Sequence, residues 1–229
     1  MGTGSRLTPL HVLAAGLAIY ACAAFAQTTD DAPVRIVRSL AVAADAIEVG
    51  SATPPAHQMH LTLRVMSGTG WSAENVLDAA KRAAGILAQC AIRTSIELHE
   101  FDGPKRYRSL FTPVSRDLAK RLALPKPAVL FVADTLQKPA FDAEAIGRSN
   151  GRTRPEMADT VWIVSGARDL PVVIAHELVH VLADSGVHSD EAQNLMRDEA
   201  CLTSTRLTPA QCNAILVRAS ANGLLQPLK

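Results

Sequence analysis

Four stretches of the chain carry the hydrophobic patterns of β-strands. Hydrophobic and polar residues alternate from His60 to Val65 and from Ile92 to Phe101, which is typical of strands with one buried face. Residues 128–132 form the continuous apolar run Ala-Val-Leu-Phe-Val, and residues 160–164 form another short apolar run. Continuous runs of this length are typical of central strands in a parallel sheet.

Helices are predicted between these strands. Ser72 is expected to cap a helix that extends to about Ala88. Ser115 is expected to cap a short helix through Arg121. Because strands and helices alternate along the chain, the sequence predicts an α/β fold with a twisted, mostly parallel sheet.

The apolar stretch at residues 172–182 contains the motif His-Glu-x-x-His. On a helix, His176 and His180 lie one turn apart on one face, so both imidazoles can bind one metal ion. The helix is apolar on nearly all sides, which predicts burial and a need for partners on its polar groups. Glu177 lies beside the histidines and is the candidate general base. The alternative is a chance pentapeptide whose polar groups bond to neighbouring residues.

A tetrahedral catalytic zinc needs a third protein ligand. His188 is the first candidate, because it follows Gly186, a residue that can turn the chain back. Asp184 and Glu199 are the alternatives. Asp184 lies eight residues beyond His176, which is about 12 Å along a helix, so the two can bind one ion only if the helix breaks between them.

The residues that follow His188 define a family pattern. Ser189 comes next, and Met196 follows eight residues after the histidine in the sequence Asn-Leu-Met. This order resembles the metzincin clan of zinc peptidases, and in particular the matrix metalloproteinases. In that family serine follows the third histidine, and a methionine lies eight residues later in a tight turn beneath the metal.

One spacing differs from the family motif. Metzincins have glycine three residues after the second histidine and the third histidine three residues further on. Here that position is Ala183, and His188 comes two residues late. Either the helix continues for another half turn, or Asp184 and Ser185 loop out.

The resemblance implies a function as well as a set of ligands. It implies zinc bound by His176, His180 and His188, with Glu177 as general base and Met196 as the Met-turn residue. The expected activity is hydrolysis of internal peptide bonds in a peptide or protein substrate. A non-catalytic secreted zinc-binding protein is the alternative, and a zinc hydrolase acting on a non-peptide amide is a third reading.

The resemblance also completes the expected architecture. It implies a zincin-like α+β fold with an active-site helix, a Met-turn and an antiparallel edge strand that pairs with extended substrate. Residues 143–147 are the candidate edge strand, with an ordinary surface loop as the alternative. Thr208 opens the capping-box sequence Thr-Pro-Ala-Gln, which predicts a C-terminal helix ending near Ala221.

Residues 1–26 have the features of a secretory signal peptide. Arg6 precedes an apolar run from Leu10 to Ala24, and Ala-Phe-Ala at residues 24–26 is a typical cleavage site. The protein is therefore expected to be secreted or periplasmic, without a stable membrane anchor after cleavage. A lipoprotein attached through Cys22 is the alternative.

The mature chain is expected to have two parts. Residues 27–56 are interpreted as a lead-in or a short pro-segment, with a further strand within residues 34–49. Residues 57–229 are interpreted as the metzincin-like catalytic domain. The mature chain has 22 basic and 22 acidic side chains, so we expect neither nucleic acid nor an anionic membrane as a partner, and we expect a monomer.

Three cysteines remain after cleavage at residue 26: Cys90, Cys201 and Cys212. Export permits a disulfide, and the odd number leaves one thiol unpaired. A pair between Cys90 and Cys212 would join the first helix to the last, whereas Cys201 and Cys212 would close a short loop; the first pairing is favoured. The spacings do not suit a cysteine zinc site. The other histidines of the mature chain, His57, His60 and His99, are expected to be strand or surface residues.

Overall fold

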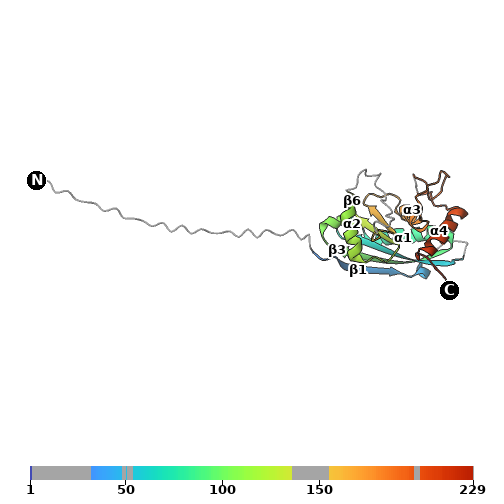
Figure 1. Ribbon diagram of the computed structural model, residues 1–229, viewed down its shortest axis with the longest axis horizontal. Coiled ribbons are helices and arrows are strands. Elements are labelled where there is room, and N and C mark those ends of the chain that lie inside the picture. The colour runs from blue at the N-terminus through green and yellow to red at the C-terminus, as the bar shows by residue number, and fades with distance from the viewer. Residues whose placement is uncertain (2–31, 48–49, 51–53, 136–154, 199–201, 229) are drawn as a thin grey trace.

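The computed structural model describes Met1 and residues 32–47, 50, 54–135, 155–198 and 202–228. Within these residues the main sheet has the strand order β1-β3-β2-β5-β7, and β8 pairs with the beginning of β2 (Figure 1). Its strands are β1 (Arg35–Val42), β2 (His57–Met66), β3 (Ile92–Asp102), β5 (Ala128–Val132), β7 (Thr160–Val164) and β8 (Gln226–Pro227).

Most neighbouring strands of the main sheet run parallel. The pairs β2–β3, β2–β5 and β5–β7 are parallel, whereas β1–β3 and β2–β8 are antiparallel. The predicted mixed α/β fold with a mostly parallel sheet is therefore confirmed. Strand β1 lies within the segment where one further strand was predicted, and it occupies an edge of the sheet. A second, two-stranded sheet pairs β4 (Ser109–Leu110) with β6 (Asp134–Thr135).

The predicted helices are present, and one begins earlier than its sequence suggests. The α-helices are α1 (Ala73–Leu87), α2 (Thr112–Leu122), α3 (Leu170–Leu182) and α4 (Pro209–Ala221). The short 3-10 helices are η1 (Ala44–Ala46), η2 (Ala88–Cys90) and η3 (Lys105–Arg108). The prediction that Ser115 caps α2 is wrong, because the N-cap is Phe111. The hydroxyl of Ser115 lies inside the helix and accepts a hydrogen bond from the Phe111 N–H at 3.1 Å.

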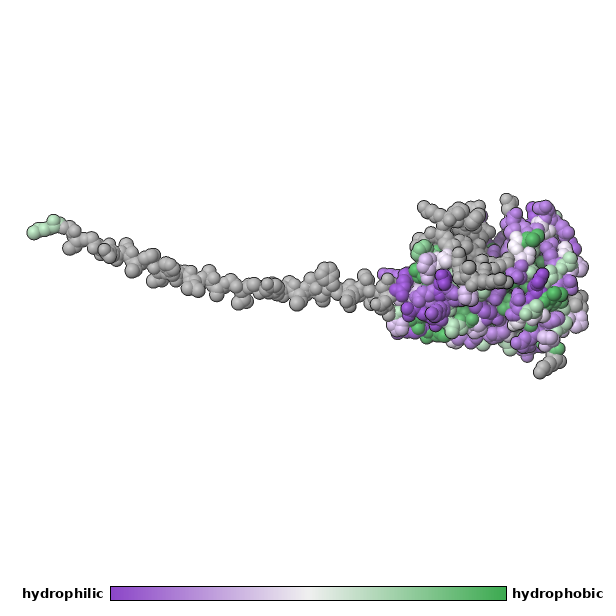
Figure 2. All heavy atoms as spheres, viewed as in Figure 1, coloured by the Kyte–Doolittle hydropathy of each residue, from purple (hydrophilic) through white to green (hydrophobic). Residues whose placement is uncertain are grey.

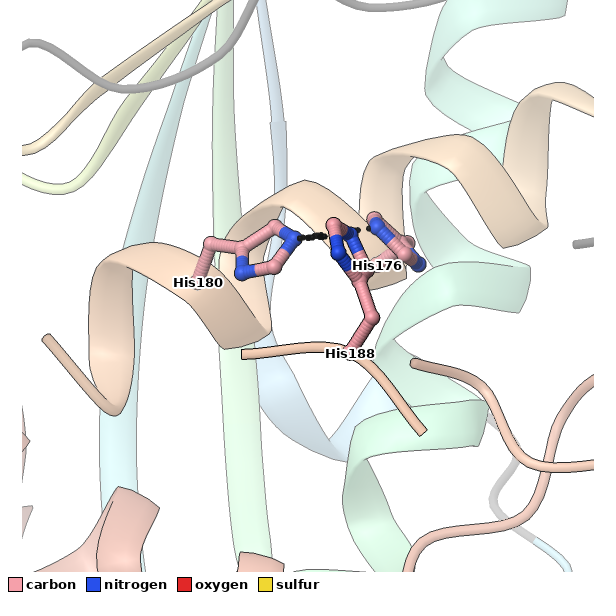
Figure 3. A group of neighbouring side chains, drawn as sticks. All are labelled: His176, His180 and His188. Carbon is pink, nitrogen blue, oxygen red and sulfur yellow. Dashed lines mark hydrogen bonds between the residues drawn. The ribbon is translucent and has the colours of Figure 1, made fainter. Parts of the chain in front are cut away.

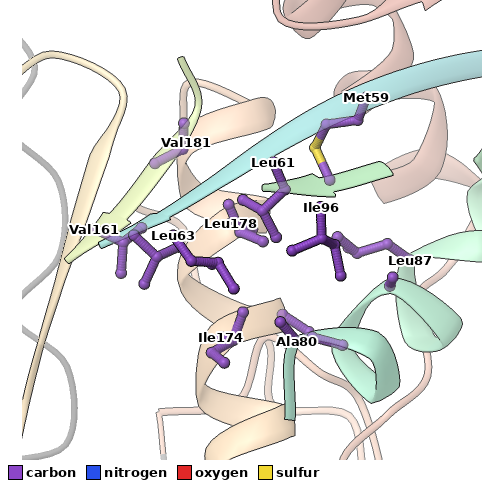
Figure 4. Packing of buried hydrophobic residues seen from close by; sticks show 14 of the residues in the cluster. Met59, Leu61, Leu63, Ala80, Leu87, Ile96, Val161, Ile174, Leu178 and Val181 are labelled. Atoms are coloured by element: carbon purple, nitrogen blue, oxygen red, sulfur yellow. The ribbon is translucent and has the colours of Figure 1, made fainter. Parts of the chain in front are cut away.

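Both faces of the central strands are buried, in two separate hydrophobic clusters. In β5, Val129 and Phe131 face one cluster, whereas Ala128, Leu130 and Val132 face the other. The first cluster lies between the sheet and the helices α1 and α3 (Figure 4). The second cluster includes residues of α2 and the buried Tyr107. Continuous apolar strands are thus explained by helices on both sides of the sheet.

Helix α1 packs beside α3 through small side chains. Ala79, Ala80, Ala83 and Ala84 are all buried in the first cluster, and Figure 4 shows Ala80 close to Ile174 of α3. The N-cap of α1 is Ser72, as predicted, and its hydroxyl accepts a hydrogen bond from the Asn75 N–H at 3.3 Å. The alanine face lets α1 lie close to both the sheet and α3, the helix that carries the His-Glu-x-x-His motif.

A disulfide joins the end of the first helical region to the last helix. Cys90, at the end of η2, is bonded to Cys212 of α4, which confirms the favoured pairing. Cys201 lies outside the described residues, as do Cys22 and the candidate edge strand at residues 143–147. Within the described part of the chain, no helix is both long and apolar enough to cross a membrane. The face seen in Figure 2 mixes hydrophilic and hydrophobic residues without one broad apolar area.

Candidate metal centre

The buried helix α3 places two histidines on one side. His176 and His180 are buried, with ring centroids 4.7 Å apart, as expected for residues one turn apart. Apolar residues around them pack between α1 and the sheet, so the backbone beneath both rings is fixed by the core. The local sequence therefore predicts the positions of His176 and His180, because it specifies both the helix and its burial.

Helix α3 ends at Leu182 in a Schellman motif, whose first carbonyl is that of His180. The Ser185 N–H donates to the His180 carbonyl, and the Asp184 N–H donates to the Val181 carbonyl, each at 3.2 Å. Asp184 occupies the left-handed position, with φ 46°. Helix α3 ends at Leu182 and the chain reverses at Asp184, so of the two alternatives for the longer spacing, the looping out of Asp184 and Ser185 is confirmed. Gly186 is not among the described glycines with positive φ. Aspartate tolerates this conformation better than most residues.

The reversal brings His188 back to the two helical histidines (Figure 3). The Nε2 atom of His180 lies 3.0 Å from Nε2 of His176 and 3.1 Å from Nε2 of His188. One nitrogen of each ring, the candidate ligand atom, lies within 4.8 Å of those of the other two rings. Two ligands of a tetrahedral zinc, each about 2.05 Å from the ion, are about 3.3 Å apart. The spacing of the three nitrogens therefore suits one shared metal ion.

The opposite nitrogen of each ring meets a hydrogen-bond acceptor. Nδ1 of His176 lies 2.7 Å from the Leu195 carbonyl, and Nδ1 of His180 lies 2.8 Å from the Ser185 carbonyl. Nδ1 of His188 lies 2.6 Å from a carboxylate oxygen of Asp198. Each Nδ1 must carry the proton, because these partners only accept, and each neutral ring then presents a lone pair at Nε2. Three converging lone pairs repel one another unless a cation lies between them.

The loop of residues 189–198, which contains Met196, supplies the Leu195 carbonyl that contacts His176. Met196 is buried, and its carbonyl accepts a hydrogen bond from the Ser189 N–H at 2.7 Å, which holds the segment after His188 against the loop. The preceding Leu195 N–H donates to the Arg206 carbonyl at 2.7 Å. The carbonyl that orients His176 is therefore fixed by backbone contacts on both sides.

Two amide side chains that sequence reasoning did not single out hold this loop. Asn194 and Gln211 exchange two hydrogen bonds of 3.1 Å, one in each direction. The Asn194 carbonyl oxygen also accepts from the Met196 N–H at 2.9 Å, and Asn194 is almost fully buried. Gln211 simultaneously completes the predicted capping box with Thr208. Only that capping box was visible in the sequence, because nothing local in the sequence indicates that Asn194 meets Gln211.

Burial shifts the pKa values of two motif residues. It raises the pKa of the Glu177 carboxyl to about 7, with desolvation as the cause. Desolvation also lowers the pKa of His176, although the hydrogen bond to the Leu195 carbonyl opposes this shift. A neutral imidazole is the form that binds a metal, so burial favours the ligand form of His176.

The other candidate ligands do not join this group. Among the described residues, His176, His180 and His188 are the group suited to a metal, and Asp184 is not part of it. Glu199 lies outside the described residues. His60 lies on an exposed position of β2 and His99 on a partly buried position of β3, and both contact Glu97, at 3.4 Å and 2.6 Å. His57 is at the start of β2, so the prediction that these three are strand residues is confirmed.

A small cavity of about 110 Å³ lies beside the cluster. Its wall is mainly apolar and is contributed by α3, by the segment that carries His188, by Met196 and by α4. The lining residues are Val179, Ala183, Ser185, Val187, His188, Met196, Gln211 and Ala214. One histidine of the cluster thus borders both the candidate metal position and this cavity.

Comparisons with known proteins give a fold likeness only. No family model matches the sequence, and no curated protein matches it. Metalloproteinase-II from Bacteroides fragilis is similar over 76% of this chain and 55% of that chain, with 18% identity and a TM-score of 0.47. A structure described as a chaperone–substrate complex is similar over 76% of this chain and 36% of that chain, with 10% identity and a TM-score of 0.49. The chain spans about half of the first structure and about a third of the second, and likeness of this degree identifies no function.

Proposed function

We propose that the protein is an exported zinc-dependent endopeptidase of the metzincin type. The observation that carries the proposal is the convergence of three Nε2 atoms whose rings all have Nδ1 bonded to an acceptor. Metal-binding histidines are oriented by such bonds, which fix the tautomer and direct the lone pair at the ion. Three imidazoles with a fourth position left for water or substrate define a catalytic rather than a structural zinc site.

The proposed chemistry divides between the metal and one carboxylate. His176, His180 and His188 would hold the zinc, which would lower the pKa of a coordinated water toward 7 and polarise the scissile carbonyl. Glu177 accepts the proton of the attacking water and delivers it to the leaving amine. A partly buried carboxyl with a pKa of about 7 is suited to both transfers near neutral pH. A neighbouring cation lowers that pKa and so favours the carboxylate that acts first.

Further features support the proposed substrate and location. The mainly apolar cavity beside His188 suits one small side chain of a peptide substrate. Among the described strands β7 ends the sheet, so its outer edge is where an extended substrate or the candidate edge strand at residues 143–147 would pair. The N-terminal signal-peptide pattern and the Cys90–Cys212 disulfide support export.

The proposal is tested by separating metal binding from catalysis. We expect wild-type protein to contain about one zinc per chain and to cleave members of a broad peptide library. The variant Glu177→Gln keeps the shape of the side chain and removes the base. It should retain zinc and fold but hydrolyse peptides at least about a hundredfold more slowly, because general acid–base assistance contributes 10²–10⁴-fold. The variant His188→Ala should lose zinc as well as activity.

The possible outcomes distinguish the readings. Equal cleavage by wild type and Glu177→Gln would show that the proposed mechanism is wrong. Zinc in both proteins with cleavage by neither would favour the non-catalytic zinc-binding protein. Undiminished zinc affinity in His188→Ala would exclude His188 as a ligand and leave Asp184 or Glu199 for that position.

A further inference from the structure

The three histidines of the cluster are oriented by two kinds of acceptor. His176 and His180 point their Nδ1 atoms at backbone carbonyls, which no side-chain substitution removes. His188 points its Nδ1 at Oδ1 of Asp198, 2.6 Å away. We infer that Asp198 is a positioning residue, whose carboxylate orients His188 and holds the metal more tightly. The inference rests on the zinc site of the proposed function.

His188 needs this partner more than the other two histidines do. His176 and His180 stand on a core helix and are buried, so packing alone restricts both rings. His188 belongs to no helix or strand, its side chain is 36% exposed, and its neighbour Val187 is 74% exposed. A ring without packing on all sides can rotate away from the ion. The bond to Asp198 therefore replaces the restriction that α3 provides for the other histidines.

A carboxylate also changes the ring that it contacts. An anionic acceptor forms a shorter and stronger hydrogen bond with an imidazole N–H than a carbonyl does. The same bond fixes the rotation of the ring, so that the opposite nitrogen, Nε2, faces Nε2 of His180 at 3.1 Å. The fixed orientation compensates for the exposed position of His188.

The loop of residues 189–198 places the Asp198 carboxylate within hydrogen-bond distance of His188. The hydrogen bond from Ser189 N–H to the Met196 carbonyl brings the segment after His188 alongside the segment that leads to Asp198. The same loop contributes the Leu195 carbonyl to His176. One short loop therefore orients two of the three histidines, one through its backbone and one through a side chain.

The test measures how fast the metal leaves, independently of catalysis. Zinc-loaded protein is mixed with an excess of a chromogenic zinc chelator, and the dissociation rate is followed in the wild type, Asp198→Ala, Asp198→Asn and Asp190→Asn. Asp190 is an exposed aspartate in the same loop with no side-chain contact to His188 among the described residues, so its variant controls for loss of charge.

We expect Asp198→Ala to release zinc about 10–100 times faster than the wild type, since removing such a partner typically weakens metal binding by that factor. Asp198→Asn keeps an acceptor oxygen without the charge and should fall between the two, and Asp190→Asn should match the wild type. Circular dichroism of the metal-free proteins checks that all variants fold alike.

Two results overturn the inference alone. One is zinc release from Asp198→Ala within about twofold of the wild type, which is well below the expected factor. The other is equal acceleration by Asp198→Ala and Asp190→Asn, which would assign the effect to charge and not to contact. Wild-type protein that binds no zinc would instead overturn the proposed function, and the inference with it.

Discussion

The two halves of the candidate metal centre are held in place by different forces. His176 and His180 stand on α3, which is surrounded by apolar side chains of the core. His188 and Met196 belong to a segment without regular structure that is fixed by backbone hydrogen bonds and buried amides. Burial of apolar area holds the helical half, whereas directional bonds hold the loop half. A change of environment or sequence should therefore affect the loop half first.

The largest expected effect comes from removing the covalent support of the loop half. Helix α4 carries both Cys212, bonded to Cys90, and Gln211, bonded to Asn194. Because the disulfide links residues 122 positions apart, the variant Cys90→Ala/Cys212→Ala should lose about 2–4 kcal/mol of unfolding free energy. Urea unfolding measures this loss, with the reduced wild type as the control.

Hydrogen exchange of the same double variant sharpens the comparison. The amides of Ser189 and Leu195 should exchange faster than in the wild type, while the central amides of α3 should change less, because the helix remains packed in the core. Equal acceleration in both halves would show that they open together, and the distinction between them would fail.

The next effect in size is expected from Asn194→Ala. This substitution removes three hydrogen bonds and leaves the side-chain NH2 of the partly buried Gln211 and the N–H of the buried Met196 without their partner. The cost should be about 1–3 kcal/mol, measured by thermal or urea unfolding. Gln193→Ala is the matched control, because Gln193 is exposed and makes no side-chain hydrogen bond among the described residues. An equally small change in both variants would mean that the amide pair does not hold the loop.

The smallest effect on the unfolding free energy is expected at the turn at Asp184, where α3 ends and the loop half begins. Helices α3 and α4 end in the same Schellman hydrogen bonds, but Asp184 holds the left-handed position in one and Gly223 in the other. Gly223→Ala should cost about 1 kcal/mol, and Asp184→Gly should stabilise by less than about 1 kcal/mol. Unfolding curves of the two variants check both signs. A clear loss in Asp184→Gly would show that contacts of the aspartate side chain outweigh its backbone strain.

The helical half could be predicted from the sequence because its determinants are local. The run of apolar residues indicates a buried helix, and the spacing of His176 and His180 places both rings on one face. Strands β5 and β7 were predicted with their observed bounds for the same reason, since five consecutive apolar or β-branched residues identify a buried strand.

In the loop half, His188 was a candidate from its position in the sequence and Met196 only through the family resemblance, and the details of this half depend on long-range contacts. The turn at Asp184 was one of two alternatives for the longer spacing, and the sequence could not choose between them because aspartate is less common than glycine at a left-handed position. Ser115 was misread as an N-cap because a hydroxyl inside the first turn can also bond back to the N-cap residue. The pair of Asn194 and Gln211 and the contact of His188 with Asp198 join residues whose encounter no sequence spacing predicts.

The alanine face of α1 has a consequence for how this site tolerates change over evolution. Ala80 and Ala84 are not candidate metal ligands, yet their small volume sets how closely α1 approaches α3 and the sheet. Adding even a few methylene groups to such a packed interface typically costs about 1–3 kcal/mol and displaces a backbone. The helix that would be displaced is the one on which His176 and His180 stand. Substitutions that enlarge these alanines can therefore displace the candidate metal position. A comparison of site residues alone would treat the same substitutions as neutral.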